Sequence, residues 1–246
     1  MTAMNIERNA LLNRIRSSID RRGYHIYVIS GNEAPRYAYT IGLYEKLGLE
    51  LVFAGGYYFS INEVQSIIYT AAAELLKENH SNAAGFKSVD FGYFKLNPVD
   101  PSWSRFMLLA AFDFYNQKQI RAIQICPTHE LCTIDIPDMT NEWESSSGPI
   151  WKSLGSGRLA GRQKFLRATT NLAVLRGEKV TEAARWEDDD WELFAGNGPD
   201  VLPGDVRVVP LNLLLAVDPT LEEIANLEIG QARWREAGAI EWHPWN

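Results

Sequence analysis

Apolar residues recur at two spacings along the first 155 residues, and these spacings predict an alternation of helices and strands. Apolar positions three or four residues apart predict helices over residues 5–22, 60–78 and 102–115. Ser60 and Glu63 form a capping box at the start of the second helix. Runs of β-branched and aromatic residues predict strands over residues 24–30, 36–43, 49–54, 86–96, 120–126 and 131–136.

The remaining part of the chain has shorter elements. Three glycines between Gly155 and Gly161 indicate a boundary. A second unit is predicted to begin with residues 165–175, and Asp218-Pro219 is predicted to start a helix, with Asp as the cap and Pro in the first turn. Further strands are predicted over residues 179–186, 191–194, 206–209, 228–234 and 239–242.

The order of these elements indicates the fold class. Strands are separated by turns as often as by helices, which argues against a doubly wound parallel sheet. We therefore predict an α+β protein of two units, residues 1–155 and 162–246. Each unit is expected to be a mainly antiparallel sheet with helices packed on one face.

Charge is unevenly distributed along the chain. The net charge of the 246 residues is −7. Between Glu182 and Glu228 there are twelve acidic residues and only two basic ones, Arg185 and Arg207. Five of the eight tryptophans lie at or beyond Trp186. An acidic surface repels phosphate, so we do not expect a nucleic-acid partner. Acidic and aromatic residues together suit a basic protein partner.

The cysteine content and the N-terminus indicate the compartment. Two cysteines, Cys126 and Cys132, do not make a disulfide framework and fit a reducing environment. The first residues lack the apolar core of a signal peptide, and no apolar run reaches the length of a membrane span. We predict a cytoplasmic protein with no membrane contact.

Two groups of residues could carry chemistry in the first unit. Cys126, His129 and Cys132 offer only three zinc ligands with no second pair, and a two-strand hairpin explains their spacing. The apolar flanks favour buried, inert thiols over a cysteine nucleophile. We therefore predict no metal and no cofactor.

The other group could surround a small-molecule pocket, and consists of His25, Tyr39, Thr40, Trp103 and Tyr115. His25 lies within an apolar strand, where a hydrogen-bonded structural histidine is the commoner role. No set of nucleophile, base and orienting group is visible, so an enzymatic or small-molecule-binding first unit is the alternative hypothesis.

The acidic run after Trp186 has three interpretations: a cation site, a partner surface or a solvated loop. The alternating oxygen ligands and central glycine of a calcium loop are absent. Trp186 and Trp191 flank the run, and rings beside charge are typical of interface anchors. The predicted partner-binding residues are Glu187, Asp188, Asp189, Asp190, Trp191 and Asp200.

An ordered set of motifs over residues 8–140 resembles a bacterial domain of unknown function, family 4262. The motifs are Gly23-Tyr24-His25, Tyr39-Thr40-Ile41-Gly42-Leu43, Pro101-Ser102-Trp103, Phe114-Tyr115 and Gln124. The chain departs from the family pattern at Tyr24, at Leu49 and at Cys126-Pro127-Thr128. The family carries no established activity.

Residues 165–243 resemble immunity protein family 33. The resemblance rests on Asp190-Trp191 with Gly196, on Asp218-Pro219-Thr220, and on Gly230 and Arg233. It implies a bacterial cytoplasmic protein that binds and neutralises a cognate toxin. From it we predict an immunity-type protein without catalysis, which occludes the active surface of a basic toxin or effector. A purely structural scaffold is a third hypothesis.

Overall fold

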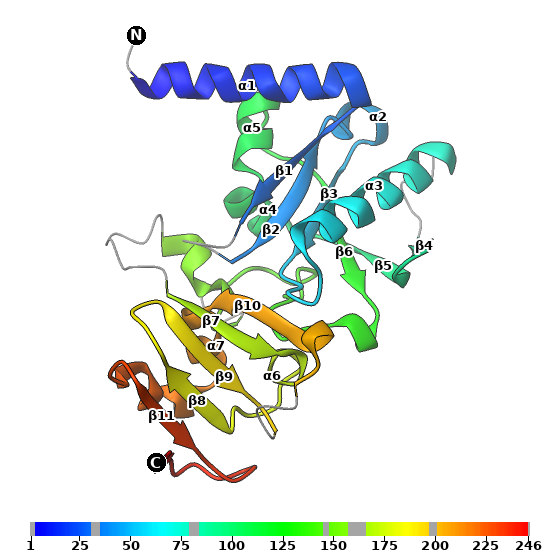
Figure 1. Ribbon diagram of the computed structural model, residues 1–246. Helices are drawn as coiled ribbons and strands as arrows, with labels where there is room; N and C mark the ends of the chain where they lie inside the picture. The colour runs from blue at the N-terminus through cyan, green and yellow to red at the C-terminus, as the bar shows by residue number, and fades with distance from the viewer. Residues whose placement is uncertain are drawn as a thin grey trace.

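The computed structural model describes residues 3–30, 35–78, 84–144, 148–156, 166–196 and 201–245. These residues form two six-stranded sheets with helices, one sheet in each half of the chain. In Figure 1 the first sheet and its helices fill the upper part of the view, and the second sheet lies below them. The predicted α+β class with two units is confirmed. No described helix is both long and apolar enough to cross a bilayer.

In the first sheet, the strand that comes last in the sequence lies in the middle of the sheet. Its strands are β1 (His25–Ile29), β2 (Tyr37–Ile41), β3 (Glu50–Ala54), β4 (Gly85–Ser88), β5 (Gly92–Pro98) and β6 (Ala122–Pro127). Their order is β1-β2-β3-β6-β5-β4. Only the β3–β6 pair is parallel, so the sheet is mainly antiparallel as predicted.

Helices cover both faces of this sheet, which departs from the prediction of one covered face. Helix α3 (Ile61–Glu78) packs on the face that carries Phe53. On the Val52 face lie α1 (Ala3–Arg22), α4 (Pro101–Met107) and α5 (Leu109–Tyr115). Every residue of β2 and β3 is buried, and strands buried on both faces require a layer on each side.

The predicted helix over residues 102–115 is divided in two. Asp100 caps α4 by accepting a hydrogen bond from the Ser102 N–H, and Pro101 occupies the first turn. Leu108 interrupts the helix at φ −92° and ψ 33°. Asn116 ends α5 in the left-handed conformation, at φ 53°, which asparagine tolerates better than most residues.

The strand predicted over residues 131–136 is wrong. A 3₁₀ turn, η1 (His129–Leu131), follows β6, and the chain then runs towards the second unit. The Ile134 N–H donates to the Leu175 carbonyl at 2.8 Å, and Asp135 is buried. Ile134 therefore contacts the second unit while Leu131 packs on the first, and the hairpin expected for the Cys126–Cys132 spacing does not form.

The second sheet has one covered face and one open face. Its strands are β7 (Arg167–Asn171), β8 (Glu182–Arg185), β9 (Asp190–Phe194), β10 (Val206–Pro210), β11 (Gln231–Trp234) and β12 (His243–Pro244). Their order is β10-β7-β9-β8-β11-β12, and only β7–β9 is parallel. Helices α6 (Leu172–Leu175) and α7 (Leu211–Val217) pack on one face with Trp191 and Leu193. Helices on one face were predicted here correctly.

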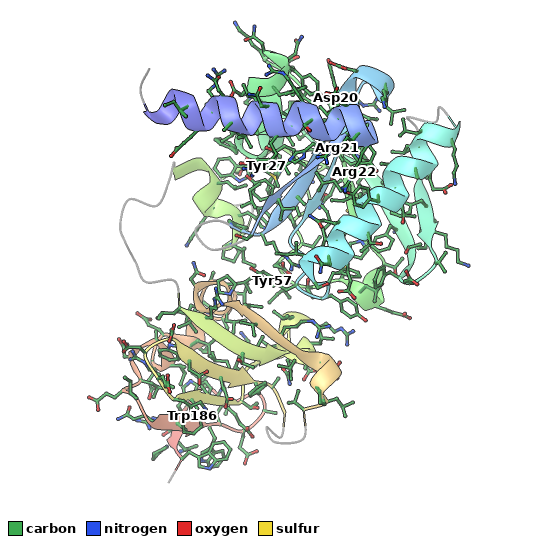
Figure 2. The ribbon with its side chains drawn as sticks, turned by 45° about the horizontal axis from the view of Figure 1, so that its top comes forward. Asp20, Arg21, Arg22, Tyr27, Tyr57 and Trp186 are labelled. Atoms are coloured by element: carbon green, nitrogen blue, oxygen red, sulfur yellow. The ribbon has the colours of Figure 1, made fainter. Side chains whose placement is uncertain are left out.

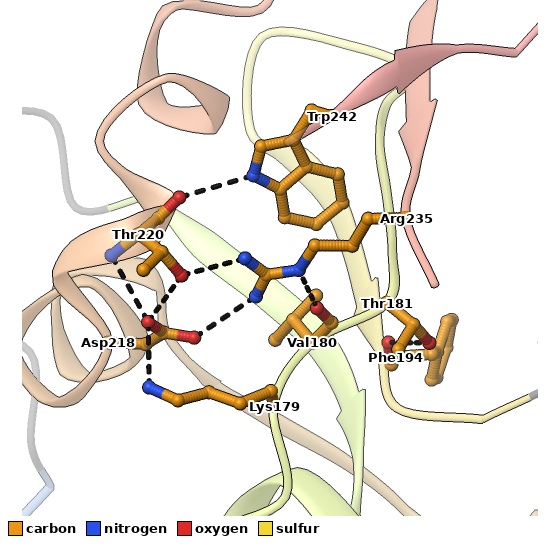
Figure 3. A network of polar contacts seen from close by, with 8 residues as sticks. All are labelled: Lys179, Val180, Thr181, Phe194, Asp218, Thr220, Arg235 and Trp242. Carbon is orange, nitrogen blue, oxygen red and sulfur yellow. Dashed lines mark hydrogen bonds and ion pairs between the residues drawn. The ribbon is translucent and has the colours of Figure 1, made fainter. Parts of the chain in front are cut away.

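A buried polar network ties the last strands to this core (Figure 3). The Arg235 guanidinium, 3% exposed, donates to the Val180 carbonyl at 2.6 Å and to Thr220 Oγ1 at 2.8 Å, and pairs with Asp218 at 3.3 Å. It also lies 4.2 Å from the centre of the Trp242 ring. Burial alone would raise the pKa of Asp218, but hydrogen bonds, chiefly from Thr220 and then from Lys179, lower it overall.

Two predicted elements in this unit differ from the structure. Asp218 caps and Pro219 begins an element as predicted, but this is a single 3₁₀ turn, η5 (Pro219–Leu221). The strand predicted over residues 239–242 is wrong, because Trp242 packs into the core and β12 begins after it. Of the three boundary glycines, Gly155 lies in η2 (Trp151–Ser156), and Gly157 and Gly161 are outside the described residues.

Candidate functional site

Four of the five predicted acidic residues come together at one hairpin turn. Strands β8 and β9 are joined by residues 186–189, and the Trp186 N–H donates to the Asp190 carbonyl at 2.9 Å. Glu187, Asp188, Asp189 and Asp190 are all exposed. Asp188 approaches Arg185 at 3.8 Å, a surface pair that contributes little to stability because water screens it. We call Glu187 to Asp190 the acidic turn.

The two tryptophans beside the acidic turn have opposite environments. Trp191 is 1% exposed and lies in the core, because Trp191 and Leu193 share the inward face of β9. This corrects the prediction that the Trp191 ring meets a partner. Trp186 is 47% exposed, and its indole N–H donates to Glu192 Oε2 at 2.8 Å. Asp200 lies outside the described residues.

A groove of about 620 Å³ lies on the open face of the second sheet. We call it the open-face groove; its walls include Thr169, Glu182, Ala184, Trp186, Glu192, Phe194, Val206, Ala232 and Trp245. Trp245 is 51% exposed, so the aromatic C-terminus contributes to this surface. Figure 2 places Trp186 on the part of the second unit that is remote from the first. The groove thus combines exposed rings with carboxylates.

The side chains predicted to surround a pocket in the first unit are mostly core residues. Tyr39, Thr40 and Trp103 are each at most 1% exposed. Tyr39 Oη accepts from the Ala110 N–H at 3.2 Å, and the Trp103 indole donates to the Asn141 carbonyl at 3.0 Å. None of the three lines the open-face groove or the cavity of about 1180 Å³ between the two units.

His25 lies on the edge strand β1 and is half-buried. Burial lowers the pKa of His25, and Arg14 adds to this effect. Its ring lies 6.3 Å from that of Tyr27. Within the part of the chain that the structure describes, no acid hydrogen-bonds the His25 ring, so nothing orients it as a base.

Thr40 and Tyr115 instead meet at Glu50, a residue that the sequence reasoning missed. Thr40 Oγ1 donates to Glu50 Oε2 at 2.5 Å, and the N–H groups of Gly42 and Tyr44 donate to Oε1 at 2.9 and 3.0 Å. The Tyr115 hydroxyl also donates to Oε1. Burial raises the pKa of Glu50, and these hydrogen bonds oppose the rise. The sequence did hold a signal for this network: an acidic residue stands between Leu49 and Leu51 in a strand that reads as buried.

The two thiols are free cysteines. Burial raises the pKa of Cys126 to about 12, and burial also raises the pKa of Cys132. A thiol with a raised pKa holds little thiolate at neutral pH and is a poor nucleophile. Across the described ranges, no three acidic, histidine or cysteine side chains are grouped closely enough to hold a metal ion.

A larger cavity, of about 1180 Å³, lies between the two units. We call it the interunit cleft; Arg36, Tyr57, Tyr58, Glu63, Arg167 and Arg207 are among its walls. Figure 2 shows Tyr57 where the units meet. The Arg207 Nε–H donates to the Tyr58 carbonyl at 3.0 Å, which joins β10 to the loop before α3.

The N-terminal unit matches one known family model. This family is described as "Domain of unknown function (DUF4262)", and the match covers residues 18–131. It supports the resemblance drawn from the sequence motifs of the first unit. No curated protein and no solved structure matches the chain.

One candidate site lies inside the DUF4262 match, and two others lie outside it. Thr40, Gly42, Glu50 and Tyr115 all lie inside it, so the Glu50 network belongs to the matched part of the chain. The acidic turn and the open-face groove lie beyond residue 131. The resemblance of the second unit to immunity protein family 33 therefore stays a prediction.

Proposed function

We propose that this protein is a non-catalytic, immunity-type binding protein whose second unit engages a basic segment of a partner protein. The observation that carries this proposal is Trp186, a half-exposed ring between the acidic turn and the open-face groove. Its hydrogen bond to Glu192 fixes the orientation of the ring. A ring held in place before binding loses less conformational entropy when a partner docks.

The chemistry of this surface suits lysine and arginine side chains. The acidic turn provides a negative field that speeds the approach of a basic protein. A cationic side chain can then lie over the face of Trp186 with a carboxylate at its edge. The apolar walls of the groove, such as Phe194 and Ala232, accept the aliphatic part of such a side chain.

A toxin is the kind of partner proposed. The resemblance of residues 165–243 to immunity protein family 33 supports it, and occlusion is the mode of action that needs no catalytic group. The bound second unit would cover a basic substrate-binding or catalytic surface of the toxin inside the bacterial cytoplasm. In the first unit, Tyr39 and Trp103 lie in the core, and Thr40 and Tyr115 bond Glu50, which favours the binding function over the enzymatic or small-molecule alternative.

The test is charge reversal with a matched control. The double variant Glu187→Lys and Asp189→Lys changes two exposed residues of the acidic turn. Glu222→Lys with Glu223→Lys makes the same change in net charge at exposed positions outside the turn and the groove. Tagged full-length proteins are used to capture partners from the native bacterium, with washes at low and high salt, and mass spectrometry identifies what is retained.

The proposal predicts one stoichiometric basic protein, lost at high salt, whose association rate falls about tenfold or more in the acidic-turn variant and little in the control. Trp186→Ala should raise the dissociation rate, because truncating a tryptophan at the centre of an interface often costs about 2 kcal/mol or more of binding free energy. Equal binding by both charge variants would remove the acidic turn from recognition. Retention of no protein by the wild-type chain would refute the proposal.

A further inference from the structure

The interunit cleft has a charge opposite to that of the whole protein. The chain carries a net charge of −7, yet the cleft walls hold three arginines, Arg36, Arg167 and Arg207, and one acid, Glu63. Glu63 Oε2 accepts from the Ser60 N–H at 2.6 Å, so this carboxylate is already occupied as the helix cap. The cleft is therefore a local positive region in an acidic molecule.

Two of the arginines are held rigidly against neighbouring tyrosines. The Arg36 guanidinium lies 4.3 Å from the centre of the Tyr57 ring, and the Arg207 guanidinium 5.6 Å from that of Tyr58. Arg36 also donates to the carbonyls of Phe59 and Gly56. Such fixed, planar cations suit phosphate oxygens, because little side-chain entropy is lost on binding.

Some donors at the cleft remain without partners. Arg36 is 7% exposed, and its Nε has no hydrogen-bond partner among the described residues. This atom is itself shielded from solvent, so the cationic groups that a ligand in the cleft meets first are those of Arg167 and Arg207. Arg167 is exposed on β7, and its guanidinium forms no hydrogen bond or ion pair with the residues that the structure describes. Ser60 and Ile61, at the positive end of the 18-residue α3, also line the cleft.

We propose that the interunit cleft binds a small organic phosphate with more than one phosphoryl group. Arginines on both walls match separate negative groups, and the tyrosines offer aromatic surface to the organic part of the ligand. The volume of about 1180 Å³ accommodates a nucleotide-sized molecule. Such a ligand would bridge β7 and β10 of one unit and the loop before α3 of the other.

Isothermal titration calorimetry of the full-length protein tests this at constant ionic strength. The probes are pyrophosphate, ADP and sulfate. The variant is Arg167→Gln, and the matched control is Arg121→Gln, which removes the same charge from an exposed position outside the cleft. Arg167 is exposed, so its loss should leave the melting temperature unchanged.

The expected result is saturable 1:1 binding of pyrophosphate, weakened about tenfold by Arg167→Gln and unchanged by Arg121→Gln. ADP should bind more tightly than pyrophosphate if its ring lies on the tyrosines, and sulfate should bind more weakly than either. No saturable binding of pyrophosphate or ADP would overturn the proposal. So would equal weakening by the two variants, which would indicate only a diffuse charge effect. Arg167 lies beside Asp190 in the register of β7 and β9, so partner binding at the acidic turn is tested separately, with the charge-reversal variants that leave Arg167 unchanged.

Discussion

Glu50 is an acidic side chain in the core of the first unit, where polar groups from several segments meet. It is fully buried, and four hydrogen bonds converge on its two carboxylate oxygens. Because burial outweighs these bonds, the pKa of Glu50 in the folded protein is raised. The folded state therefore holds a proton at Glu50 more tightly than the unfolded chain does. The free energy of unfolding must then increase as pH falls from the raised folded-state pKa of Glu50 to the pKa of the unfolded chain.

The variant Glu50→Gln tests this linkage. Glutamine keeps the shape and the acceptor for the backbone N–H groups, but it does not titrate. Wild type should gain stability relative to Glu50→Gln as pH falls from the raised folded-state pKa towards about 4.3, the ordinary value for glutamate. Urea unfolding at a series of pH values measures the difference.

The control for this experiment is Glu50→Ala, which removes the acceptor and leaves the surrounding donors buried. Relative to Glu50→Gln, it should cost roughly 2–4 kcal/mol at every pH, because unsatisfied donors and a small cavity remain and neither variant titrates at this position. The contradicting outcome is a constant difference in stability between wild type and Glu50→Gln over the whole pH range. It would show that the pKa of Glu50 in the folded protein is not raised above its unfolded value.

At the scale of elements, the turn between β3 and α3 depends on glycine. Gly55 has φ +72°, and its N–H donates to the Arg36 carbonyl at 2.8 Å. A Cβ added there would lie 2.3 Å from the Asp135 carbonyl oxygen, which is backbone and cannot easily move. The turn therefore requires both the left-handed conformation and the absence of a side chain.

Gly55→Ala should cost about 3 kcal/mol or more, through the clash with Asp135 added to backbone strain. Gly48→Ala is the matched control. It has φ +69° and no atom within 4 Å of the added Cβ, so it should cost only about 1–2 kcal/mol. Thermal and urea unfolding of both variants measure these losses. Similar losses would indicate that the clash is relieved by movement of the backbone.

Elements with a clear local pattern were predictable from the sequence, and those fixed by distant contacts were not. The β-branched strands and the capped α3 follow from neighbouring residues alone. The run Leu211–Val217 is almost continuously apolar, and such short runs do not separate helix from strand. Residues 131–136 look like a strand, but Ile134 contacts the second unit, a contact that the sequence cannot display.

The same distinction applies to the candidate sites. The acidic turn is local, and its four residues were identified from the sequence. The open-face groove joins Thr169, Trp186 and Trp245 through the strand order β7-β9-β8-β11-β12, which no local pattern specifies. Trp191 was predicted to contact a partner, but the strand begins at Asp190 and its alternation places Trp191 inside, while Trp186 is the exposed ring.

At the scale of the whole molecule, Tyr58 couples the two units. Its half-buried ring packs against the core of the first unit and that of the second. The Arg176 guanidinium lies 5.8 Å from the ring centre, and Arg176 also donates to the Glu130 carbonyl at 3.0 Å. Arg176 and Arg207 therefore connect the second unit to two segments of the first unit, the loop before α3 and the turn η1.

Tyr58→Ala should separate the unfolding of the two units. Calorimetry is expected to give two overlapping transitions in place of a single cooperative one, because the shared packing is lost. Tyr69→Ala is the matched control, since the Tyr69 ring lies 5.9 Å from Tyr24, and its hydroxyl bonds Arg22 within the first unit. Tyr69→Ala should lower the temperature of unfolding and keep a single transition. Loss of cooperativity in both variants, or in neither, would refute the coupling through Tyr58.

The position of β6 has a consequence for synthesis on the ribosome. It is the last strand of the first sheet to be made, yet it lies between β3 and β5. Until residues 122–127 emerge, the β1–β3 ladder and the β4–β5 hairpin each present an unpaired edge to other nascent chains. Unpaired edges of this kind recruit strands from neighbouring molecules. Translation from Pro98 to Pro127 is therefore the interval in which this chain most needs a chaperone.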